Sequence, residues 1–300
     1  MGREIGRLLT AMVTPFHDDG SLNLGAAQAL AGRLLQDGSD GVVLAGTTGE
    51  APTLDDDEKI ELIRAVREAI PDGSVVAGTG SNDTRHSIAL SERAMAAGAD
   101  ALLAVVPYYN RPPQEGIFRH FQALAEVGPT IMYNIQSRTG VNMTAQTTLR
   151  AAELPGVIGV KEASGDLTQI GLICASRPPG FQVWSGDDAL TLPLLGVGGD
   201  GVICVVSHLA GTAMRGMIEA HANGEQARAT AIHLRLLPLM RALMTASTSP
   251  IPVKSVLARL GFETGPFRLP LVPMPSQDLV ALMGVVEDSG ELISVGVALG

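Results

Sequence analysis

The stretch Val157-Ile-Gly-Val-Lys161-Glu-Ala-Ser-Gly165 is a short run of apolar and β-branched residues that ends in a lysine. Four consecutive apolar or glycine residues predict a strand covered on both faces, which is typical of parallel sheets in α/β proteins. A lysine at the end of such a strand is poorly hydrated, and desolvation favours its neutral amine. A neutral lysine amine can condense with a carbonyl substrate as a Schiff base. The alternative for Lys161 is a strand-end side chain that reaches solvent.

Short apolar strands of this kind recur along the chain, each followed by a helical pattern. The predicted strands span residues 8–15, 41–46, 74–80, 100–106, 129–135, 157–161, 181–185 and 200–206. Helical patterns follow at about 23–36, from 55, from 82 or 83, and at 114–127, 144–153, 166–176, 188–195 and 209–222. Eight such units without a central reversal favour a closed α/β structure, the (β/α)8 TIM barrel. A doubly wound open sheet is the alternative.

After Asn223-Gly224 the strand pattern stops. Helical patterns remain at about 225–246, 250–260 and 276–288, separated by prolines at 266, 270, 273 and 275. The sequence therefore predicts a catalytic barrel over residues 1–224 and a C-terminal helical region over residues 225–300. The apolar residues after Gly290 receive no predicted role.

Composition narrows the class of function. The net charge of −10 argues against a nucleic-acid or anionic-membrane partner, because binding phosphate groups requires clustered cations. No apolar run approaches the ~20 residues that span a bilayer, and the N-terminal residues lack the pattern of a secretion signal, so we expect a cytoplasmic protein. The two cysteines are expected to be reduced and packed. The six histidines lack metal-site spacing. We therefore expect small-molecule substrates, no metal and no cofactor.

Polar residues collect where the predicted strands end, which is the catalytic face of a barrel. Gly46-Thr-Thr-Gly-Glu50 follows the second strand and Pro107-Tyr-Tyr-Asn-Arg-Pro112 follows the fourth. The fifth strand carries Tyr133 and is followed by Ser137-Arg-Thr-Gly140. All three tyrosines of the chain thus share a face with Lys161, and this convergence favours a catalytic lysine.

Each of these residues suits a step in Schiff-base chemistry on a 2-oxo acid. Thr47 and Thr48 offer hydroxyls and backbone N–H groups to a carboxylate, although a plain turn is the alternative. Tyr133, with Thr47 and Tyr109 as hydrogen-bonding partners, is suited to proton transfer, although it could instead be a core aromatic. Arg138 can hold a second carboxylate in a bidentate manner, and a surface arginine is its alternative.

Two other motifs are given structural roles. Gly196-Val-Gly-Gly-Asp-Gly201 precedes the eighth strand and so lies on the opposite face, where it is expected to end a helix. In Ser185-Gly-Asp-Asp188 the carboxylates are expected to cap the next helix. His208 is expected to be packed or capping, not catalytic.

Taken together, these motifs resemble the dihydrodipicolinate synthase/N-acetylneuraminate lyase family, and within it the synthase branch. The resemblance covers almost the whole chain, and it also includes Thr10-Ala-Met-Val-Thr-Pro15, Gly159-Val-Lys-Glu-Ala163, Ser185-Gly-Asp-Asp-Ala189 and Pro250-Ile-Pro-Val-Lys254. It implies a Schiff-base condensation of pyruvate with aspartate semialdehyde in lysine and diaminopimelate biosynthesis.

The resemblance also implies roles for individual residues. Lys161 would form the pyruvate imine, and Tyr133, Thr47 and Tyr109 would relay protons. The substrate-binding residues would be Thr48 and Arg138, for the two substrate carboxylates, with the Ile203 carbonyl, Gly46 and Gly186. In the family the tyrosine that matches Tyr109 reaches a neighbouring subunit's site, and the usual assembly is a homotetramer, a dimer of dimers.

The sequence departs from the synthases in two places. Gln136 stands where they usually have proline before Ser-Arg-Thr-Gly, which leaves the aldehyde open. Ala51, Asp56, Lys59 and His86 replace residues of the lysine-feedback pocket, which argues against feedback inhibition. The alternatives are a family lyase acting on sialic acid or a 2-keto-3-deoxy sugar acid, and a non-catalytic barrel that binds a 2-oxo acid.

Overall fold

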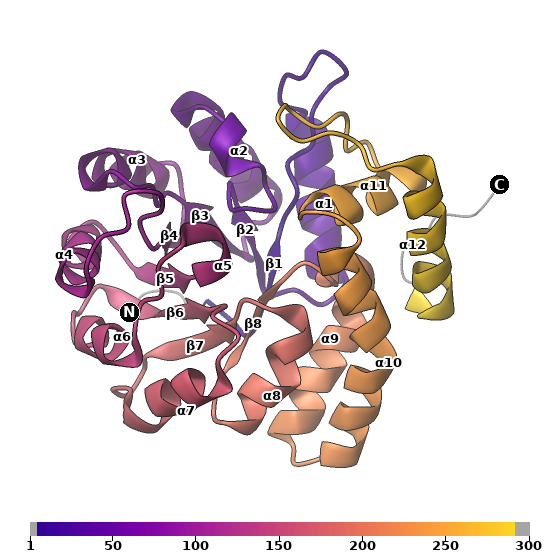
Figure 1. The fold of residues 1–300 in the computed structure, drawn as a ribbon. Helices are drawn as coiled ribbons and strands as arrows, with labels where there is room; N and C mark the ends of the chain where they lie inside the picture. Colours follow the sequence, from indigo (N-terminus) through magenta and orange to yellow (C-terminus); the bar gives the residue numbers. More distant parts are fainter. Residues whose placement is uncertain (1–4, 292–300) are drawn as a thin grey trace.

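The centre of the computed structural model, which describes residues 5–291, is a closed barrel of parallel strands in the order β1 to β8 (Figure 1). The strands are β1 (Leu8–Ala11), β2 (Gly41–Leu44), β3 (Ser74–Gly78), β4 (Ala101–Val105), β5 (Thr130–Asn134), β6 (Val157–Glu162), β7 (Gln182–Ser185) and β8 (Gly201–Cys204). The barrel closes where Leu9 of β1 pairs with Ile203 of β8. The predicted TIM barrel is confirmed, and the open sheet is wrong.

Helices surround the barrel and alternate with its strands. They are α1 (Leu24–Gln36), α2 (Asp56–Ala69), α3 (Thr84–Ala96), α4 (Gln114–Ala125), α5 (Gln136–Thr139), α6 (Ala145–Ala152), α7 (Leu167–Ser176), α8 (Thr191–Gly196) and α9 (Ser207–Ala222). Local sequence sets their starts: Asp55 and Glu58 form a capping box at α2, and the Asp83 carboxylate accepts the Arg85 N–H at α3. These caps explain why the predicted helix starts lie close to the observed ones.

Two predicted segments were wrong in detail. No helix was predicted at Ser137-Arg-Thr-Gly140, but with Gln136 this segment forms the one helical turn α5, because Ile135 and Gln136 accept hydrogen bonds from the Thr139 and Gly140 N–H groups. Gly140 has a φ of 73° and ends that turn. The predicted helix 188–195 is a short 3-10 turn, η2 (Asp188–Leu190), that continues into α8.

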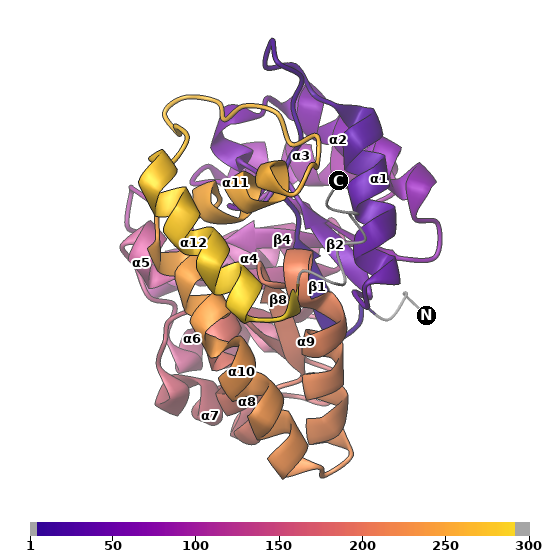
Figure 2. The same cartoon turned by 90° about the vertical axis from the view of Figure 1, so that its right-hand side faces the viewer.

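The C-terminal helices are α10 (Gln226–Thr245), α11 (Ile251–Arg259) and α12 (Ser276–Asp288). Helix α10 packs beside α9, and α12 lies across α10 and also contacts α11 (Figures 1 and 2). Leu236 and Met240 of α10 belong to the same buried apolar cluster as Met214 and Met217 of α9. The predicted boundary at residue 224 falls between α9 and α10, yet the apolar core continues across it. Residues 1–4 and 292–300 lie outside the described part of the chain.

The barrel interior is filled with side chains. Its buried cluster contains Leu9, Ala11, Val43, Val76, Leu103, Ile131, Tyr133, Trp184 and Ile203. Trp184 is fully buried, and its indole N–H donates to the Gly6 carbonyl at 2.9 Å, ahead of β1. A filled interior leaves the end of the barrel as the place for a site, and Tyr133 and Lys161 lie near the carboxyl ends of their strands.

Candidate active site

Lys161 and Tyr133 form the centre of the candidate site. They are register partners on β6 and β5, and Trp184 of β7 pairs with Lys161 on the other side. Both side chains are buried, with Lys161 6% and Tyr133 6% exposed. The Lys161 Nζ lies 4.4 Å from the centroid of the Tyr133 ring. The lysine therefore points into the barrel, and the solvent-reaching alternative is wrong.

Gly186, directly after β7, forms one wall of the lysine pocket. A methyl group at this position would lie 3.1 Å from Lys161 Cε and 2.7 Å from Ala163 Cβ, so a side chain here would press on the lysine stem. The Gly186 N–H donates to the Glu162 carbonyl at 2.8 Å, which fixes the loop against β6. Ile203 of the neighbouring strand β8 lies in the same buried cluster as Tyr133.

Thr47 and Thr48 lie in a compact turn after β2. The Gly46 carbonyl accepts the N–H groups of Gly49 and Ala51, and the Thr47 carbonyl accepts that of Glu50 at 3.2 Å. From the segment after β1, the Thr14 hydroxyl donates to the Gly49 carbonyl at 2.7 Å. Thr48 is buried and Thr47 half-buried.

A cavity of about 770 Å³ opens above the barrel end. Gly46, Thr47, Tyr133 and Arg138 all line it, together with Tyr108. The structure thus brings together residues that are far apart in the sequence and that sequence analysis assigned to one site. A cavity of this size suits small-molecule substrates.

Two predicted site residues are exposed to solvent. Arg138, on α5, is exposed; one of its guanidinium nitrogens donates to the Ser249 carbonyl at 3.4 Å, a long hydrogen bond that leaves the group free to bind an anion. Tyr109 is 90% exposed, with a φ of 70°, whereas Tyr133 is buried. The structure of one chain therefore does not bring Tyr109 to Tyr133. Several other predicted site residues also lie outside the cavity lining: Thr48, Lys161, Gly186 and Ile203.

The acidic motif after β7 supports the barrel end. The Asp187 carboxylate caps η2 through the Ala189 N–H. Asp188 is buried, accepts the N–H groups of Val205 and Val206 and so fixes the chain after β8. Burial raises the pKa of Asp188 to about 6, and these two N–H groups oppose the rise. The predicted capping role is correct for Asp187 only.

His208 is packed, as predicted. Its ring nitrogens lie 3.2 Å from the Val13 N–H nitrogen and 2.8 Å from the Val205 carbonyl oxygen. Burial lowers the pKa of His208 to about 4, so the ring is neutral and its Nδ1–H donates to Val205. Gly196-Val-Gly-Gly-Asp-Gly201 likewise has the predicted role, because the Gly198 and Gly199 N–H groups close the end of α8.

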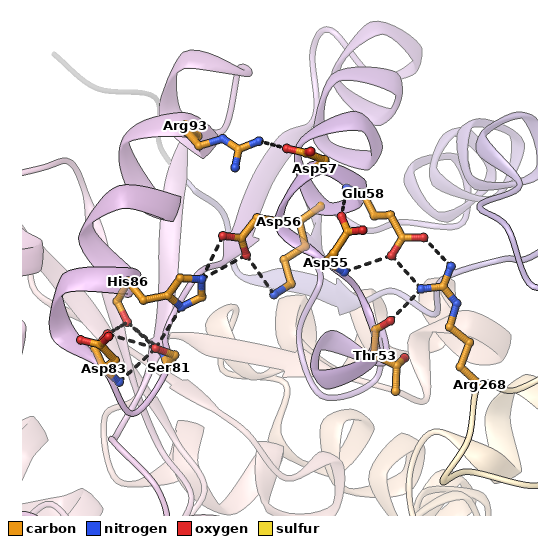
Figure 3. A network of polar contacts seen from close by, with 12 residues as sticks. Thr53, Asp55, Asp56, Asp57, Glu58, Ser81, Asp83, His86, Arg93 and Arg268 are labelled. Carbon is orange, nitrogen blue, oxygen red and sulfur yellow. Dashed lines mark hydrogen bonds and ion pairs between the residues drawn. The ribbon is translucent and has the colours of Figure 1, made fainter.

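A charged network lines the outer part of the cavity (Figure 3). His86 Nε2 lies 2.9 Å from an Asp56 carboxylate oxygen, and Lys59 Nζ lies 3.9 Å from the other oxygen. Burial lowers the pKa of Lys59, and the Asp56 carboxylate opposes that shift. By the family resemblance, sequence analysis placed these three residues in the lysine-feedback pocket.

Sequence analysis missed the interior role of Lys254, which it took only as the start of a helix. Lys254 is 1% exposed and forms an ion pair with Glu50 of the Thr47–Thr48 turn. One signal was present: Lys254 is the single charge in the apolar run that opens α11. Spacing alone could not reveal its partner, which lies 204 residues away.

No helix within residues 5–291 is both long and apolar enough to cross a membrane. The same residues contain no cluster of three or more histidine, cysteine, aspartate or glutamate side chains suited to hold a metal ion.

A closed barrel with a buried lysine beside a tyrosine, at the carboxyl ends of adjacent strands, has the architecture of a lyase that forms a Schiff base. The model of the Dihydrodipicolinate synthetase family matches residues 4–288. The chain belongs to this family.

Curated relatives and solved structures agree with this membership. The chain is 52% identical over 290 residues to the 4-hydroxy-tetrahydrodipicolinate synthase of Moorella thermoacetica, covering 96% of this chain and 99% of the relative. Its fold is similar to the synthase of Cyanidioschyzon merolae with lysine bound, with a TM-score of 0.92 and 42% identity over 95% of this chain and 98% of that one. The chloride-inhibited synthase of Acinetobacter baumannii complexed with pyruvate gives a TM-score of 0.92 at 34% identity, covering 96% and 100%.

Proposed function

We propose that this protein is a 4-hydroxy-tetrahydrodipicolinate synthase, which condenses pyruvate with aspartate semialdehyde in lysine and diaminopimelate biosynthesis. The observation that carries the proposal is the buried Lys161 amine, 4.4 Å from the centroid of the Tyr133 ring. The relatives with about half of their residues in common bear the name of this activity.

The proposed chemistry begins at Lys161. Its amine adds to the C2 carbonyl of pyruvate, and the former carbonyl oxygen leaves as water after Tyr133 supplies a proton. Loss of a C3 proton from the imine gives an enamine, whose C3 attacks the aldehyde carbon of the second substrate. The new alkoxide takes up a proton, and the amino group of the bound aldehyde then displaces Lys161 from C2, which closes the ring and frees the enzyme.

The two substrate carboxylates need separate binding groups. We assign the pyruvate carboxylate to the Thr47–Thr48 turn, whose hydroxyls and N–H groups lie on the β2 side of the barrel end, with Gly46, Gly186 and the Ile203 carbonyl completing the pocket. Arg138 lines the same cavity and is assigned to the carboxylate of the aldehyde. Because Arg138 is held by one long hydrogen bond, it is available for a bidentate contact.

Borohydride trapping tests the proposal. Pyruvate and borohydride together should add one reduced pyruvate to the peptide that contains Lys161, and Lys161→Ala should give no adduct. The chain has only two other lysines, Lys59 and Lys254, so peptide mapping assigns the site directly. An adduct on either of those lysines instead contradicts the role of Lys161, and no adduct at all contradicts the Schiff-base mechanism.

A substrate panel separates the synthase from its nearest alternatives. Aspartate semialdehyde should be consumed with pyruvate, whereas N-acetylneuraminate and 2-keto-3-deoxy sugar acids should not be cleaved at a comparable rate. Preferred cleavage of a sugar acid would instead identify a lyase of the same family. Imine formation without turnover of any tested substrate would instead support the alternative of a non-catalytic barrel that binds a 2-oxo acid.

We infer that the active assembly is a homotetramer in which Tyr109 enters a neighbouring subunit's site. The support is its 90% exposure in a single chain, unusual for a tyrosine with a catalytic role. Mixing inactive Lys161→Ala with inactive Tyr109→Phe subunits should restore part of the activity, because some sites then receive both intact residues. Subunit exchange without recovery contradicts this role of Tyr109.

We also infer a cytoplasmic location, supported by Cys174 and Cys204, which are both free thiols. We further propose that lysine does not inhibit the enzyme, because Asp56 pairs with His86 and Lys59, and the family resemblance places all three residues in the feedback pocket. A lysine titration of the activity, with Asp56→Asn as the comparison variant, tests this point. Inhibition of the wild type at submillimolar lysine contradicts it.

A further inference from the structure

The most deeply buried ion pair in the described part of the chain joins the C-terminal region to the Thr47–Thr48 turn. The Lys254 Nζ donates to a Glu50 carboxylate oxygen at 2.6 Å, and each side chain is at most 1% exposed. The Lys254 Nζ also donates to the Pro266 carbonyl at 2.8 Å and lies 4.4 Å from the centroid of the Phe16 ring. Burial lowers the pKa of Lys254, and Glu50 opposes that shift.

The Glu50 carboxylate is held on both oxygens. Its second oxygen accepts the Arg268 N–H at 3.2 Å, from the loop between α11 and α12. The Arg268 guanidinium then donates to the Thr53 carbonyl at 2.7 Å and forms an ion pair with Glu58 of α2 (Figure 3). The C-terminal region thus binds the connection between β2 and α2 at Glu50 and Thr53, and α2 itself at Glu58.

Glu50 is also the residue that closes the Thr47–Thr48 turn. It has a φ of 57°, and its N–H donates to the Thr47 carbonyl. This left-handed conformation is costly for a residue with a side chain, so contacts outside the turn must maintain it. The turn cannot relax inward, because a methyl group on Gly49 would already lie 3.1 Å from the Ala45 nitrogen and 3.2 Å from the Met12 carbonyl.

A buried ion pair is a weak source of net stability, since the cost of desolvating two charges offsets most of their attraction. Its geometric effect is stronger, because both partners must keep their positions to avoid leaving a buried charge unpaired. We propose that Glu50 and Lys254 are positioning residues for the substrate site: through them the C-terminal region holds the Thr47–Thr48 turn in the conformation that receives the pyruvate carboxylate. This inference rests on the proposed function.

The test measures the pyruvate concentration that gives half-maximal imine trapping at Lys161, together with turnover at saturating pyruvate. For Glu50→Gln and Lys254→Met we expect the half-saturating concentration to rise at least ~10-fold while saturated turnover falls by less than ~3-fold. Glu50→Asp should behave like Glu50→Gln, since it keeps the charge but shortens the connection. A normal half-saturating concentration in Glu50→Asp overturns the inference.

A double variant addresses the outcome in which single variants fail to fold. Glu50→Leu with Lys254→Met removes both charges and should fold, because an apolar pair of similar volume commonly replaces a buried ion pair. It should still bind pyruvate at least ~10-fold more weakly, since an apolar side chain in place of Glu50 cannot accept the Arg268 N–H or orient the turn. Pyruvate binding equal to that of the wild type overturns the inference.

A matched control is the ion pair of Arg177 and Asp200, near the amino-terminal ends of β7 and β8. Asp200→Asn should lower the unfolding temperature without changing the half-saturating concentration of pyruvate. An equal change in this control would mean that general destabilisation explains the effect, which overturns the inference. The proposed function fails separately, if the wild type gives no adduct at all.

Discussion

The Tyr133 ring lies against the Lys161 amine, with 4.4 Å between the ring centroid and Nζ, and the two residues pair across β5 and β6. The face of an aromatic ring attracts a cation, so the ring can stabilise the protonated imine of the proposed reaction at this position. The same side chain carries the hydroxyl assigned to proton transfer. The ring and the hydroxyl therefore have separable effects.

Tyr133→Phe should keep the ring and remove only the hydroxyl. We expect turnover to fall by ~10²–10⁴-fold, the usual contribution of a general acid–base group, with an unfolding temperature close to that of the wild type. Tyr133→Leu should lower both turnover and stability, because it also removes the wall beside Lys161. Steady-state kinetics and thermal unfolding check the two variants, and near-normal turnover in Tyr133→Phe excludes the hydroxyl from the proton path.

Gly186→Ala should displace the lysine. The added methyl group would meet Lys161 Cε at 3.1 Å, and a misplaced nucleophile reacts slowly, so we expect borohydride trapping to slow by at least ~10-fold. Gly171→Ala is the control, because a methyl group there, on α7, meets open space. Equal trapping rates in the two variants would contradict the packing of Gly186 on the lysine.

Arg138→Ala should act on the second substrate alone. Imine trapping with pyruvate should be retained, while kcat/KM for aspartate semialdehyde falls by at least ~10-fold, or ~1.4 kcal/mol, for the loss of a charged contact. Arg119→Ala, an exposed arginine on α4, is the control. Unchanged kcat/KM in Arg138→Ala would contradict the binding of the aldehyde carboxylate by Arg138.

His120 should make stability depend on pH. Burial lowers its pKa from 6.5 to about 4, opposed by Asp83, so between these values the unfolded chain binds a proton that the folded chain does not. The contribution of neutral His120 to the free energy of unfolding is fully present above pH 6.5. It is lost as the pH falls towards 4, and the loss is at most ~3 kcal/mol. Urea unfolding at several pH values should show that His120→Asn loses less free energy of unfolding than the wild type as the pH falls. Parallel plots of unfolding free energy against pH for the two proteins would contradict this role of His120.

The sequence predicted the features that depend on local pattern. The helix expected over 276–288 is α12, and β6 ends one residue beyond its predicted end because Glu162 continues the ladder to Ser185. Lys161 and Tyr133 could be found because parallel strands in a barrel end on one face. The Glu50–Lys254 contact could not be predicted, because the two residues are 204 positions apart and no local sequence pattern connects them. The proposed contact of Tyr109 with a neighbouring subunit likewise could not be predicted from local pattern, because it would depend on the surface of a second chain.

The separation of Glu50 and Lys254 also has a consequence for the order in which the protein is made. The Glu50 carboxylate emerges early in synthesis, but its buried partner follows 204 residues later. At typical rates of ~5–20 residues per second, the ribosome needs at least ~10 seconds to reach it. During that interval the carboxylate must stay hydrated, so the connection between β2 and α2 cannot take its final place. The Thr47–Thr48 turn is therefore among the last parts of the nascent protein to mature, although its residues are among the first to be made.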